Sequence, residues 1–364
     1  MRTVVIGGFG NFGSRICRAL QADSAIRIIA AGRHPDPSRQ AARVETAQLD
    51  IDAPDFRQRL MSLSPDLVIH CAGPFQNQDY RVAEAAASMR ANYIDLSDGR
   101  TFVTKFADAM GTAAHDAGVL MISGASSVPA LSSAVIDALL PRFGRLEEIR
   151  MFIAPGQRAQ RGAATLAGVF SYAGRPMKWL RGGVWQDAWG WQELVRIDLP
   201  DLGWRWAAAC DIPDLDLLPV RYHGVRTVEF RAALEFGIQH FALWVTGSLR
   251  RSGVPLPIER MASKIDRVAS LLNCFGGERG GMLVSLAGIG TNALKTRIDW
   301  HITADRNHGP EIPCMAAILL ARKMAKGELA ARGAFPCMDF LSLADFESEF
   351  ARWYMRTGIR ETPW

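Results

Sequence analysis

The chain has 364 residues and a formal net charge of +5, with 49% hydrophobic and 22% charged residues. This length exceeds one ordinary domain and suits two, and the composition excludes disordered and fibrous proteins. The basic residues are scattered rather than grouped in a Lys/Arg block, so we expect no nucleic-acid partner. The mild positive charge suits small anionic ligands.

The cysteines and the apolar runs bear on the compartment. None of the six cysteines belongs to a CxxC pair, which predicts reduced, buried thiols in a cytoplasmic protein. The chain passes from Met1 and Arg2 directly into a strand-like run, so we expect no signal peptide. No uninterrupted apolar stretch reaches about 18 residues, so we expect no membrane span.

The first 125 residues alternate short apolar runs with amphipathic segments. Six runs are typical of buried strands, at residues 3–7, 26–31, 44–49, 67–71, 93–96 and 119–123. Helical periodicity lies between them, at residues 11–20, 56–63, 81–90 and 101–117. Strands that alternate with helices predict an α/β domain with a parallel, doubly wound sheet.

The pattern changes after Pro129. Residues 132–140 are predicted to form a helix that leaves the sheet, and residues 147–153, 193–197, 227–232 and 296–302 to be strands of a second, more antiparallel sheet. Residues 260–275, 313–327 and 343–357 are predicted helices. Six of the ten tryptophans lie between Trp179 and Trp206. They form either an apolar pocket wall or the core or oligomer interface of a second domain, and we expect a homodimer.

A dinucleotide-binding motif opens the chain. Gly8, Gly10 and Gly13, with Asn11 and Phe12 between them, form G-x-G-x-x-G directly after a predicted strand and at the start of a predicted helix. Gly8 permits the tight turn, Gly10 lets the backbone approach the pyrophosphate, and Gly13 lets helix and strand pack closely. The helix N-terminus then offers free N–H groups to the phosphates.

The residue after the second strand favours NADP(H) over NAD(H). An NAD enzyme usually places Asp or Glu there for the ribose hydroxyls, whereas this chain has Arg33 and no acid. A guanidinium can pair with the 2′-phosphate of NADP(H). Arg39 and Arg43 are further candidates for the same contact. The alternative interpretation of Arg33 is a solvated surface arginine.

Two more segments fit a bound dinucleotide. Asp50 follows the third strand, where it either approaches the adenine edge or caps the next segment. Ala72, Gly73, Pro74 and Phe75 follow the fourth strand, where small residues let the backbone pass beside the ribose and nicotinamide. Cys71 is interpreted as a small buried filler rather than a nucleophile.

Catalytic candidates are sought at the ends of the later strands, because the protein must orient the substrate and supply a proton. Asp98 and Ser126 follow the fifth and sixth strands, and active-site duty and loop capping stay open for both. Asp95 is interpreted as structural. His308 precedes the C-terminal helix and either acts in acid–base chemistry or hydrogen-bonds locally. The histidines show no HxxxH or HExxH spacing, so we expect no metal site.

Several of these segments together resemble a known family. The run GGFGNFGSRICRAL at residues 7–20, AGPF at 72–75 and YIDLSD at 93–98 are similar to saccharopine dehydrogenase-like proteins with their NADP-binding domain. GASSVPALSS at residues 124–133 resembles the family's turn before a long domain-connecting helix. The resemblance covers the first 135 residues, and is looser at 213–234 and 308–329.

The resemblance implies a Rossmann domain at residues 1–130 and NADP(H) as cofactor. It also implies an inserted α+β domain at residues 131–309, with a mostly antiparallel sheet, for substrate binding and dimerisation. The C-terminal helices, at residues 310–364, would return to the Rossmann domain. The chain departs from the family on two loops: it has Ser97-Asp98-Gly99 in place of a Gly-Glu pair, and Gly124-Ala125-Ser126 in place of Gly-Phe-Asp. No specific reaction is therefore carried over.

The leading hypothesis is an NADP(H)-dependent oxidoreductase that acts on a C=N, C=O or activated C=C bond. Its small substrate is unidentified and is expected between the two domains near Asp98, Ser126 and His308. Arginines of the second half are either holders of a substrate carboxylate or surface charges; these are Arg158, Arg161 and Arg221. Two alternatives are a non-catalytic NADP(H)-binding redox sensor and an enzyme that recycles its nicotinamide, as polyamine-forming relatives do.

Overall fold

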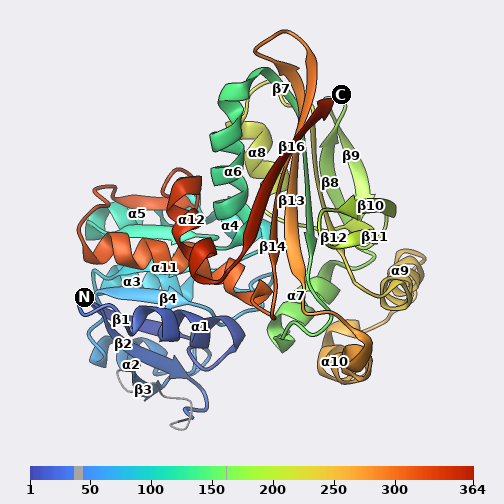
Figure 1. Ribbon diagram of the computed structural model, residues 1–364. Helices are drawn as coiled ribbons and strands as arrows, with labels where there is room; N and C mark the ends of the chain where they lie inside the picture. Colours follow the sequence, from blue (N-terminus) through green and yellow to red (C-terminus); the bar gives the residue numbers. More distant parts are fainter. Residues whose placement is uncertain (37–43, 161) are drawn as a thin grey trace. The chain divides into compact units, whose positions relative to one another are not determined.

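The structure is a computed structural model that describes residues 1–36, 44–160 and 162–364. Its contacts divide the chain into two compact units (Figure 1). Unit 1 comprises Met1–Leu131 and Glu311–Leu341, and unit 2 comprises Ser132–Pro310 and Ser342–Trp364. The expected return of residues 310–364 to the first domain therefore does not extend past Leu341, because the last residues pair with the sheet of unit 2.

Unit 1 is built on a seven-stranded parallel sheet, called sheet A. Its strands run in the order β15-β6-β5-β4-β1-β2-β3, and every neighbouring pair is parallel. The strands are β1 (Arg2–Ile6), β2 (Arg27–Gly32), β3 (Val44–Gln48), β4 (Leu67–His70), β5 (Asn92–Asp95), β6 (Leu120–Ser123) and β15 (Gly333–Pro336). The strand order reverses between β1 and β4, which is the place where doubly wound sheets bind ligands.

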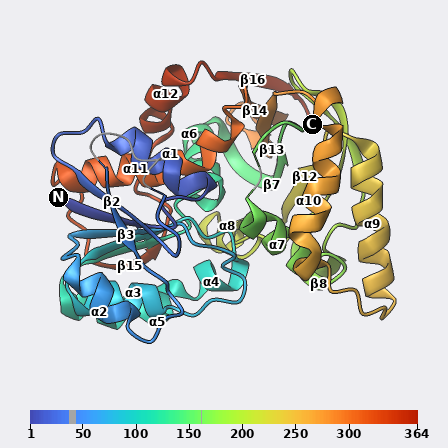
Figure 2. The same cartoon turned by 90° about the horizontal axis from the view of Figure 1, so that it is seen from below.

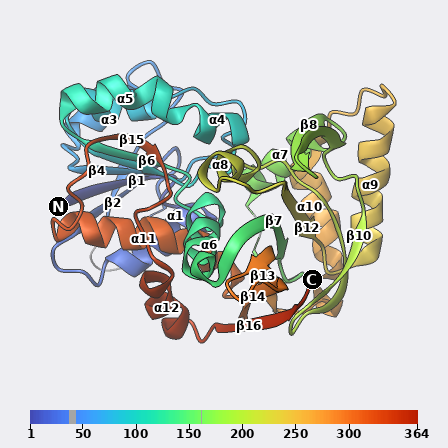
Figure 3. The same ribbon diagram turned by 90° about the horizontal axis from the view of Figure 1, so that it is seen from above.

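Helices cover both faces of sheet A. Figures 2 and 3 show α1 and α11 on one face and α3 and α5 on the other. The helices of this unit are α1 (Asn11–Leu20), α2 (Phe56–Ser62), α3 (Arg81–Ser88), α4 (Arg100–Thr104), α5 (Phe106–Ala117), the π-helix η2 (Ser127–Leu131) and α11 (Ile312–Ala325). The single helix predicted at residues 101–117 is wrong: it breaks at Lys105, where the Thr104 hydroxyl bonds back to the Arg100 carbonyl at 2.9 Å.

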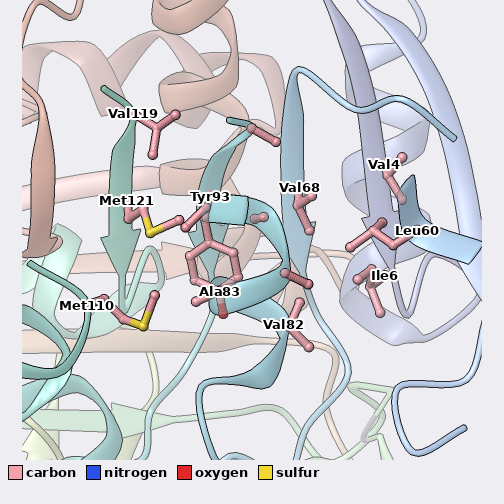
Figure 4. Packing of buried hydrophobic residues seen from close by; sticks show 14 of the residues in the cluster. Val4, Ile6, Leu60, Val68, Val82, Ala83, Tyr93, Met110, Val119 and Met121 are labelled. Carbon is pink, nitrogen blue, oxygen red and sulfur yellow. The ribbon is translucent and has the colours of Figure 1, made fainter. Parts of the chain in front are cut away.

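The core of unit 1 forms where α2, α3 and α5 pack on sheet A. Strand residues such as Val68, Tyr93 and Met121 are fully buried there with Met110 of α5. Figure 4 shows Tyr93 and Met121, from neighbouring strands, beside Met110. Burial of apolar surface, at about 25 cal/mol per Å², stabilises this layer.

Unit 2 contains a nine-stranded mixed sheet, called sheet B. Its main path is β10-β11-β12-β7-β13-β14-β16, and β8 joins β9 to β12. Among the described residues, these strands pair antiparallel except for β7 with β12. The strands are β7 (Phe143–Ala154), β8 (Pro176–Arg181), β9 (Val184–Trp189), β10 (Val195–Leu199), β11 (Gly203–Ala209), β12 (Thr227–Ala233), β13 (Gly280–Gly290), β14 (Lys295–Ala304) and β16 (Arg356–Pro363). The predicted α/β fold with a mostly antiparallel second sheet is confirmed.

The helices of unit 2 are mostly short. They are α6 (Ser132–Leu139), η3 (Leu140–Arg142), α7 (Ala163–Tyr172), α8 (Asp214–Arg221), α9 (Gly237–Arg251), η4 (Ile258–Met261), α10 (Ala262–Ser270), η5 (Leu271–Phe275) and α12 (Leu343–Arg352), and η6 (Gly309–Glu311) spans the boundary between the units. Figures 1 and 2 show α9 and α10 side by side. In the described part of the chain, no helix is both long and apolar enough to cross a bilayer.

The C-terminal segment and two cysteines correct the sequence-based expectations. The predicted helix at residues 343–357 ends at Arg352, and β16 then pairs antiparallel with β14. None of the six cysteines is in a disulfide, but Cys71 is only half-buried, and Cys274 is exposed rather than buried. It lies in the short helix η5, where its neighbours Leu271 and Phe275 are also exposed.

Candidate cofactor and active site

The glycine-rich turn is fastened to the end of the second strand. The amides of Gly7 and Gly8 both donate to the carbonyl of Ala31, at 2.8 and 3.1 Å, and the amide of Gly10 donates to the Gly7 carbonyl at 2.8 Å. Gly7 has a φ of +80°, which few other residues tolerate. The left-handed position of the turn is therefore Gly7, one residue before the first glycine of the motif, and the sequence pattern did not single it out.

The three motif glycines differ in the space around them. A Cβ on Gly8 would lie 2.8 Å from the Ala30 Cβ. One on Gly13 would lie 2.8 Å from both Gly7 C and Gly8 Cα, and closer still to the Gly7 carbonyl oxygen. A Cβ on Gly10 would meet only the Gly7 oxygen, at 3.1 Å. Gly8 and Gly13 thus permit strand, turn and helix to pack, whereas Gly10 leaves its outer side open.

The N-terminus of α1 is prepared for an anion. Gly10 is its N-cap, no described side chain caps the helix, and the first turn holds no acid. The first amides of a helix have no acceptor within the helix, and the dipole there favours negative charge. Asn11, Phe12 and Gly13 form this first turn. A pyrophosphate fits these features, because the site offers amide donors and an open Gly10.

Arg33 lies beside the turn, directly after β2. Its side chain is exposed and has no hydrogen-bond or ion-pair partner among the residues that the structure describes. Its carbonyl accepts a hydrogen bond from Gln48 Nε2 at 3.3 Å, which ties the end of β2 to β3. The guanidinium is therefore available to a ligand phosphate. The further candidates Arg39 and Arg43 lie outside the described residues.

Asp50 closes a local turn. Its Oδ1 accepts the amide of Asp52 at 3.2 Å, and its carbonyl accepts the amide of Ala53 at 3.2 Å. The side chain is half-buried. One carboxylate oxygen thus stabilises the chain after β3, as Asp does in many turns.

The loop after β4 is held by a side chain that the sequence did not suggest. Gln78 Nε2 donates to the carbonyls of Ala72 and Pro74, at 2.7 and 3.0 Å. Ala72 and Gly73 are half-buried, and Pro74 is exposed. Phe75 instead points into the core, with its ring 5.4 Å from that of Phe102. Only the backbone and the small side chains of this loop are therefore open to a ligand.

Buried polar groups lie where β4 and β5 end. His70 Nδ1 lies 3.1 Å from the Tyr93 hydroxyl, and burial lowers the pKa of His70 to about 4. Asp95 Oδ1 accepts three bonds, from the amides of Ser97 and Gly124 at 2.9 Å and from the Ser123 hydroxyl at 3.0 Å. Burial raises the pKa of Asp95 to about 6. Asp95 thus organises the loops after β5 and β6, in agreement with its structural interpretation.

Asp98 stands at the edge of this cluster and is half-buried. Its Oδ1 accepts a hydrogen bond from Gln76 Nε2 at 3.0 Å. Burial raises the pKa of Asp98, and the bond from Gln76 opposes that rise. Gln76 comes from the loop after β4, so this contact joins two of the loops expected around a nicotinamide.

Ser126 lies in the turn that leaves β6. Gly124 has a φ of +81°, and a Cβ there would lie 2.7 Å from Pro129 Cδ, so this turn requires glycine. The Ser126 amide donates to the Gly124 carbonyl at 2.8 Å, and the side chain is largely buried. The hydroxyl is thus held on a short, tightly packed loop at the carboxyl end of sheet A.

The described site candidates of unit 2 bond to other residues of the same unit. His308 Nδ1 donates to the Trp353 carbonyl at 3.1 Å, and its ring lies 4.9 Å from the Trp353 ring. Arg158 donates to the Asn273 carbonyl at 2.9 Å and pairs with Glu278. Arg221 pairs with Asp137 at 2.8 Å, and Arg161 lies outside the described residues. Among the described residues, no group of three or more His, Cys, Asp or Glu side chains could hold a metal ion.

Comparison with known proteins identifies the first domain and the fold. The family model described as the saccharopine dehydrogenase NADP binding domain matches residues 3–168. No curated protein matches the sequence significantly. Apo saccharopine dehydrogenase (L-Glu forming) from Saccharomyces cerevisiae has a TM-score of 0.66 and 9% identity, and the alignment covers 99% of each chain. A meso-dapdh mutant from Clostridium tetani E88, with DAP, has a TM-score of 0.49 and 13% identity over 96% of this chain and 98% of that one. The similarity to the Saccharomyces cerevisiae structure shows that the two chains share a fold.

Proposed function

We propose that the protein is an NADP(H)-dependent oxidoreductase, because residues 3–168 match the family model described as the saccharopine dehydrogenase NADP binding domain. The observation that carries the proposal is the uncapped N-terminus of α1, beside an Arg33 without a partner among the described residues. When bound, NADP(H) supplies or accepts the hydride. The chain's own residues then have three tasks: to bind the cofactor, to orient the substrate and to handle a proton.

The binding task falls to the elements around the turn. The first-turn amides of α1 at Asn11, Phe12 and Gly13 would hold the pyrophosphate, with Gly8 and Gly10 allowing the close approach. Arg33 would hold the 2′-phosphate as a planar fork. Asp50 would lie near the adenine, and the loop of Ala72, Gly73, Pro74 and Phe75 near the ribose and nicotinamide.

Proton handling is assigned to Asp98. Its pKa is raised by burial, so a larger share of the carboxyl keeps its proton near neutral pH than in an exposed aspartate. Oδ1 is occupied by Gln76, which leaves Oδ2 to hold the proton and donate it to the nitrogen or oxygen of a C=N or C=O bond. Ser126 would orient the same substrate. His308 keeps a free Nε2 for a substrate contact when Nδ1 donates to Trp353.

The experiment is an assay of NADPH oxidation against four substrate classes: 2-oxo acids with ammonia, ketones, aldehydes and enones. We expect turnover with at least one class, its loss in Gly10→Glu, and its retention in Gly111→Glu. Gly111 is a matched control because nothing lies within 4 Å of a Cβ at that position. NADPH binding without consumption in any class would contradict the enzyme and favour the redox sensor.

A further inference from the structure

Unit 2 contains a cavity of about 610 Å³, and all of the residues that line it belong to this unit. It lies at the ends of β11, β13 and β14. Its lining is unusually charged for a cavity of this size, and comprises Asp201, Leu202, Arg205, Glu235, Gly277, Glu278, Arg279, Asp305 and Arg306. This volume matches the range of small-molecule sites.

Arg205 is the central group of the cavity. Its residue exposure is only 8%, and it sits on β11 next to a small apolar cluster that includes Leu199, Ala207 and Leu283. Nη1 donates to the Pro155 carbonyl at 3.0 Å. Among the described residues, Nε and Nη2 make no hydrogen bond. Because only Nη1 is bonded, the Nε–Nη2 edge of this largely buried guanidinium is available to a ligand in the cavity. Burial lowers the pKa of Arg205, and the nearby Glu235 opposes this.

Two lining carboxylates are neutralised by arginines. Asp305 accepts Arg279 Nε at 2.7 Å, and Arg356 lies 3.5 Å from Asp305 and 3.4 Å from Asp201. Arg279 and Arg356 are therefore committed to acids of the protein itself. Neither needs a ligand.

The other two lining carboxylates are also occupied. Glu235 accepts the amides of Gln157 and Gly277, both at 2.7 Å and one on each oxygen. Glu278 pairs with Arg158 at 3.4 Å. Every acid of the cavity thus has a partner in the protein. The two cations of the lining that have no acid partner are Arg205 and Arg306, among the residues that the structure describes.

Arg306 reaches the cavity from a strained turn. It has a φ of +52° and the following Asn307 a φ of +59°. Two consecutive non-glycine residues in the left-handed region cost of the order of 1 kcal/mol or more each. The turn is fixed by the Asn307 amide, which donates to the Glu278 carbonyl at 3.2 Å. This turn carries the exposed Arg306 at the cavity.

We propose that this cavity binds a carboxylate-bearing small molecule. The Nε–Nη2 edge of Arg205 holds the carboxylate side-on through two parallel hydrogen bonds, the geometry in which guanidinium and carboxylate fit best. Arg306 supplies the second positive charge. The low-dielectric setting strengthens the pairing, because Arg205 is desolvated before the ligand arrives. The proposal goes beyond the proposed function, because Arg205 and Arg306, which carry it, have no part in the cofactor or substrate contacts assigned there.

The test is calorimetric titration of the full-length protein with glutarate and with its neutral analogue glutaramide. We expect saturable binding of glutarate and none of glutaramide. Arg205→Lys keeps the charge but loses the planar fork, so it should weaken glutarate binding at least about tenfold, which is about 1.4 kcal/mol. Arg306→Gln, at an exposed position, should weaken it less.

The matched control is Arg196→Gln. Arg196 lies on β10 of the same hairpin, next to Trp204 and out of register with Arg205, whose partner is Ile197. The Arg196→Gln variant should bind glutarate with the affinity of the wild type. No glutarate binding by the wild type, or equal weakening by Arg196→Gln and Arg205→Lys, would overturn the proposal, and tighter binding of inorganic phosphate would overturn the carboxylate assignment. Gly10→Glu should retain glutarate binding, which separates this site from the cofactor site.

Discussion

Replacing the glycines of the turn one at a time separates packing from cofactor binding. In Gly13→Ala the new Cβ would press on three backbone atoms of Gly7 and Gly8, and none of them can rotate away. In Gly10→Ala the new Cβ meets a single oxygen at 3.1 Å, and the φ and ψ of −77° and 178° suit alanine. The two variants carry the same chemical change only three residues apart.

The two substitutions should change the stability of the protein by different amounts. Overpacking costs typically 1–3 kcal/mol, and rigid backbone contacts place Gly13→Ala near the upper end, at about 3 kcal/mol. This loss would occur although alanine is the better helix former by about 1 kcal/mol. At 2–4 °C per kcal/mol for a domain of 150–250 residues, the melting temperature falls by roughly 10 °C. In Gly10→Ala the small steric cost is offset by about 0.4–1 kcal/mol from the less flexible unfolded chain, so stability should stay close to that of the wild type.

The assay combines thermal unfolding with NADPH titration. Gly10→Ala should melt like the wild type and bind NADPH at least about tenfold more weakly, because the methyl group occupies the side from which the pyrophosphate approaches. Gly13→Ala should instead have a lower melting temperature than the wild type. Wild-type affinity in Gly10→Ala, or wild-type stability in Gly13→Ala, would refute this account of the turn.

Three further predictions concern titratable groups. Burial raises the pKa of Asp214 to about 7, so its folded state keeps a proton that the unfolded state releases, and stability is lost as pH rises. Asp214→Asn should remove roughly 2 kcal/mol of the loss between pH 5 and pH 7. If urea unfolding gave the variant the wild-type slope of stability against pH, this prediction would be contradicted. The pKa of His70 is lowered to about 4, so its stabilising contribution is present above pH 6.5 and lost as pH falls towards 4. Denaturation curves of His70→Gln should therefore show about 3 kcal/mol less acid destabilisation than those of the wild type. Parallel pH profiles of stability in the two proteins would exclude this role of His70. Asp98→Asn should lower turnover by about two orders of magnitude and leave the NADPH dissociation constant unchanged. The rate of reduction by the wild type should decline as pH rises through the pKa of Asp98. Full activity of Asp98→Asn would show that another group donates the proton.

The sequence was most informative where structure is set by local spacing. The six strands predicted for the first domain correspond to β1 through β6, because each is a short apolar run bounded by turn residues. The position of Arg33 after β2 followed from counting along one strand–helix–strand unit. Such signals need no knowledge of the distant parts of the chain.

Contacts between residues that are distant in the chain could not be predicted from the sequence. Gln76 and Gln78 are polar loop residues with no pattern of their own, and only the fold shows that they bind Asp98 and the Ala72 carbonyl. Strand β13 was missed because its glycines hide the alternation, although they allow close strand approach. Arg205 left a usable signal: a charged residue at an inward position of a strand is unusual enough to mark a site.

The most direct test of the central claim is a fluorescence titration of the wild type, Arg33→Gln and Arg57→Gln with NADPH and with NADH. Arg57 is an exposed arginine of α2 and serves as the charge-matched control. The account predicts NADPH binding at least about tenfold tighter than NADH, about 1.4 kcal/mol, in the wild type and in Arg57→Gln, and a loss of this preference in Arg33→Gln. Equal affinity of the wild type for the two cofactors, or an undiminished preference in Arg33→Gln, would contradict it.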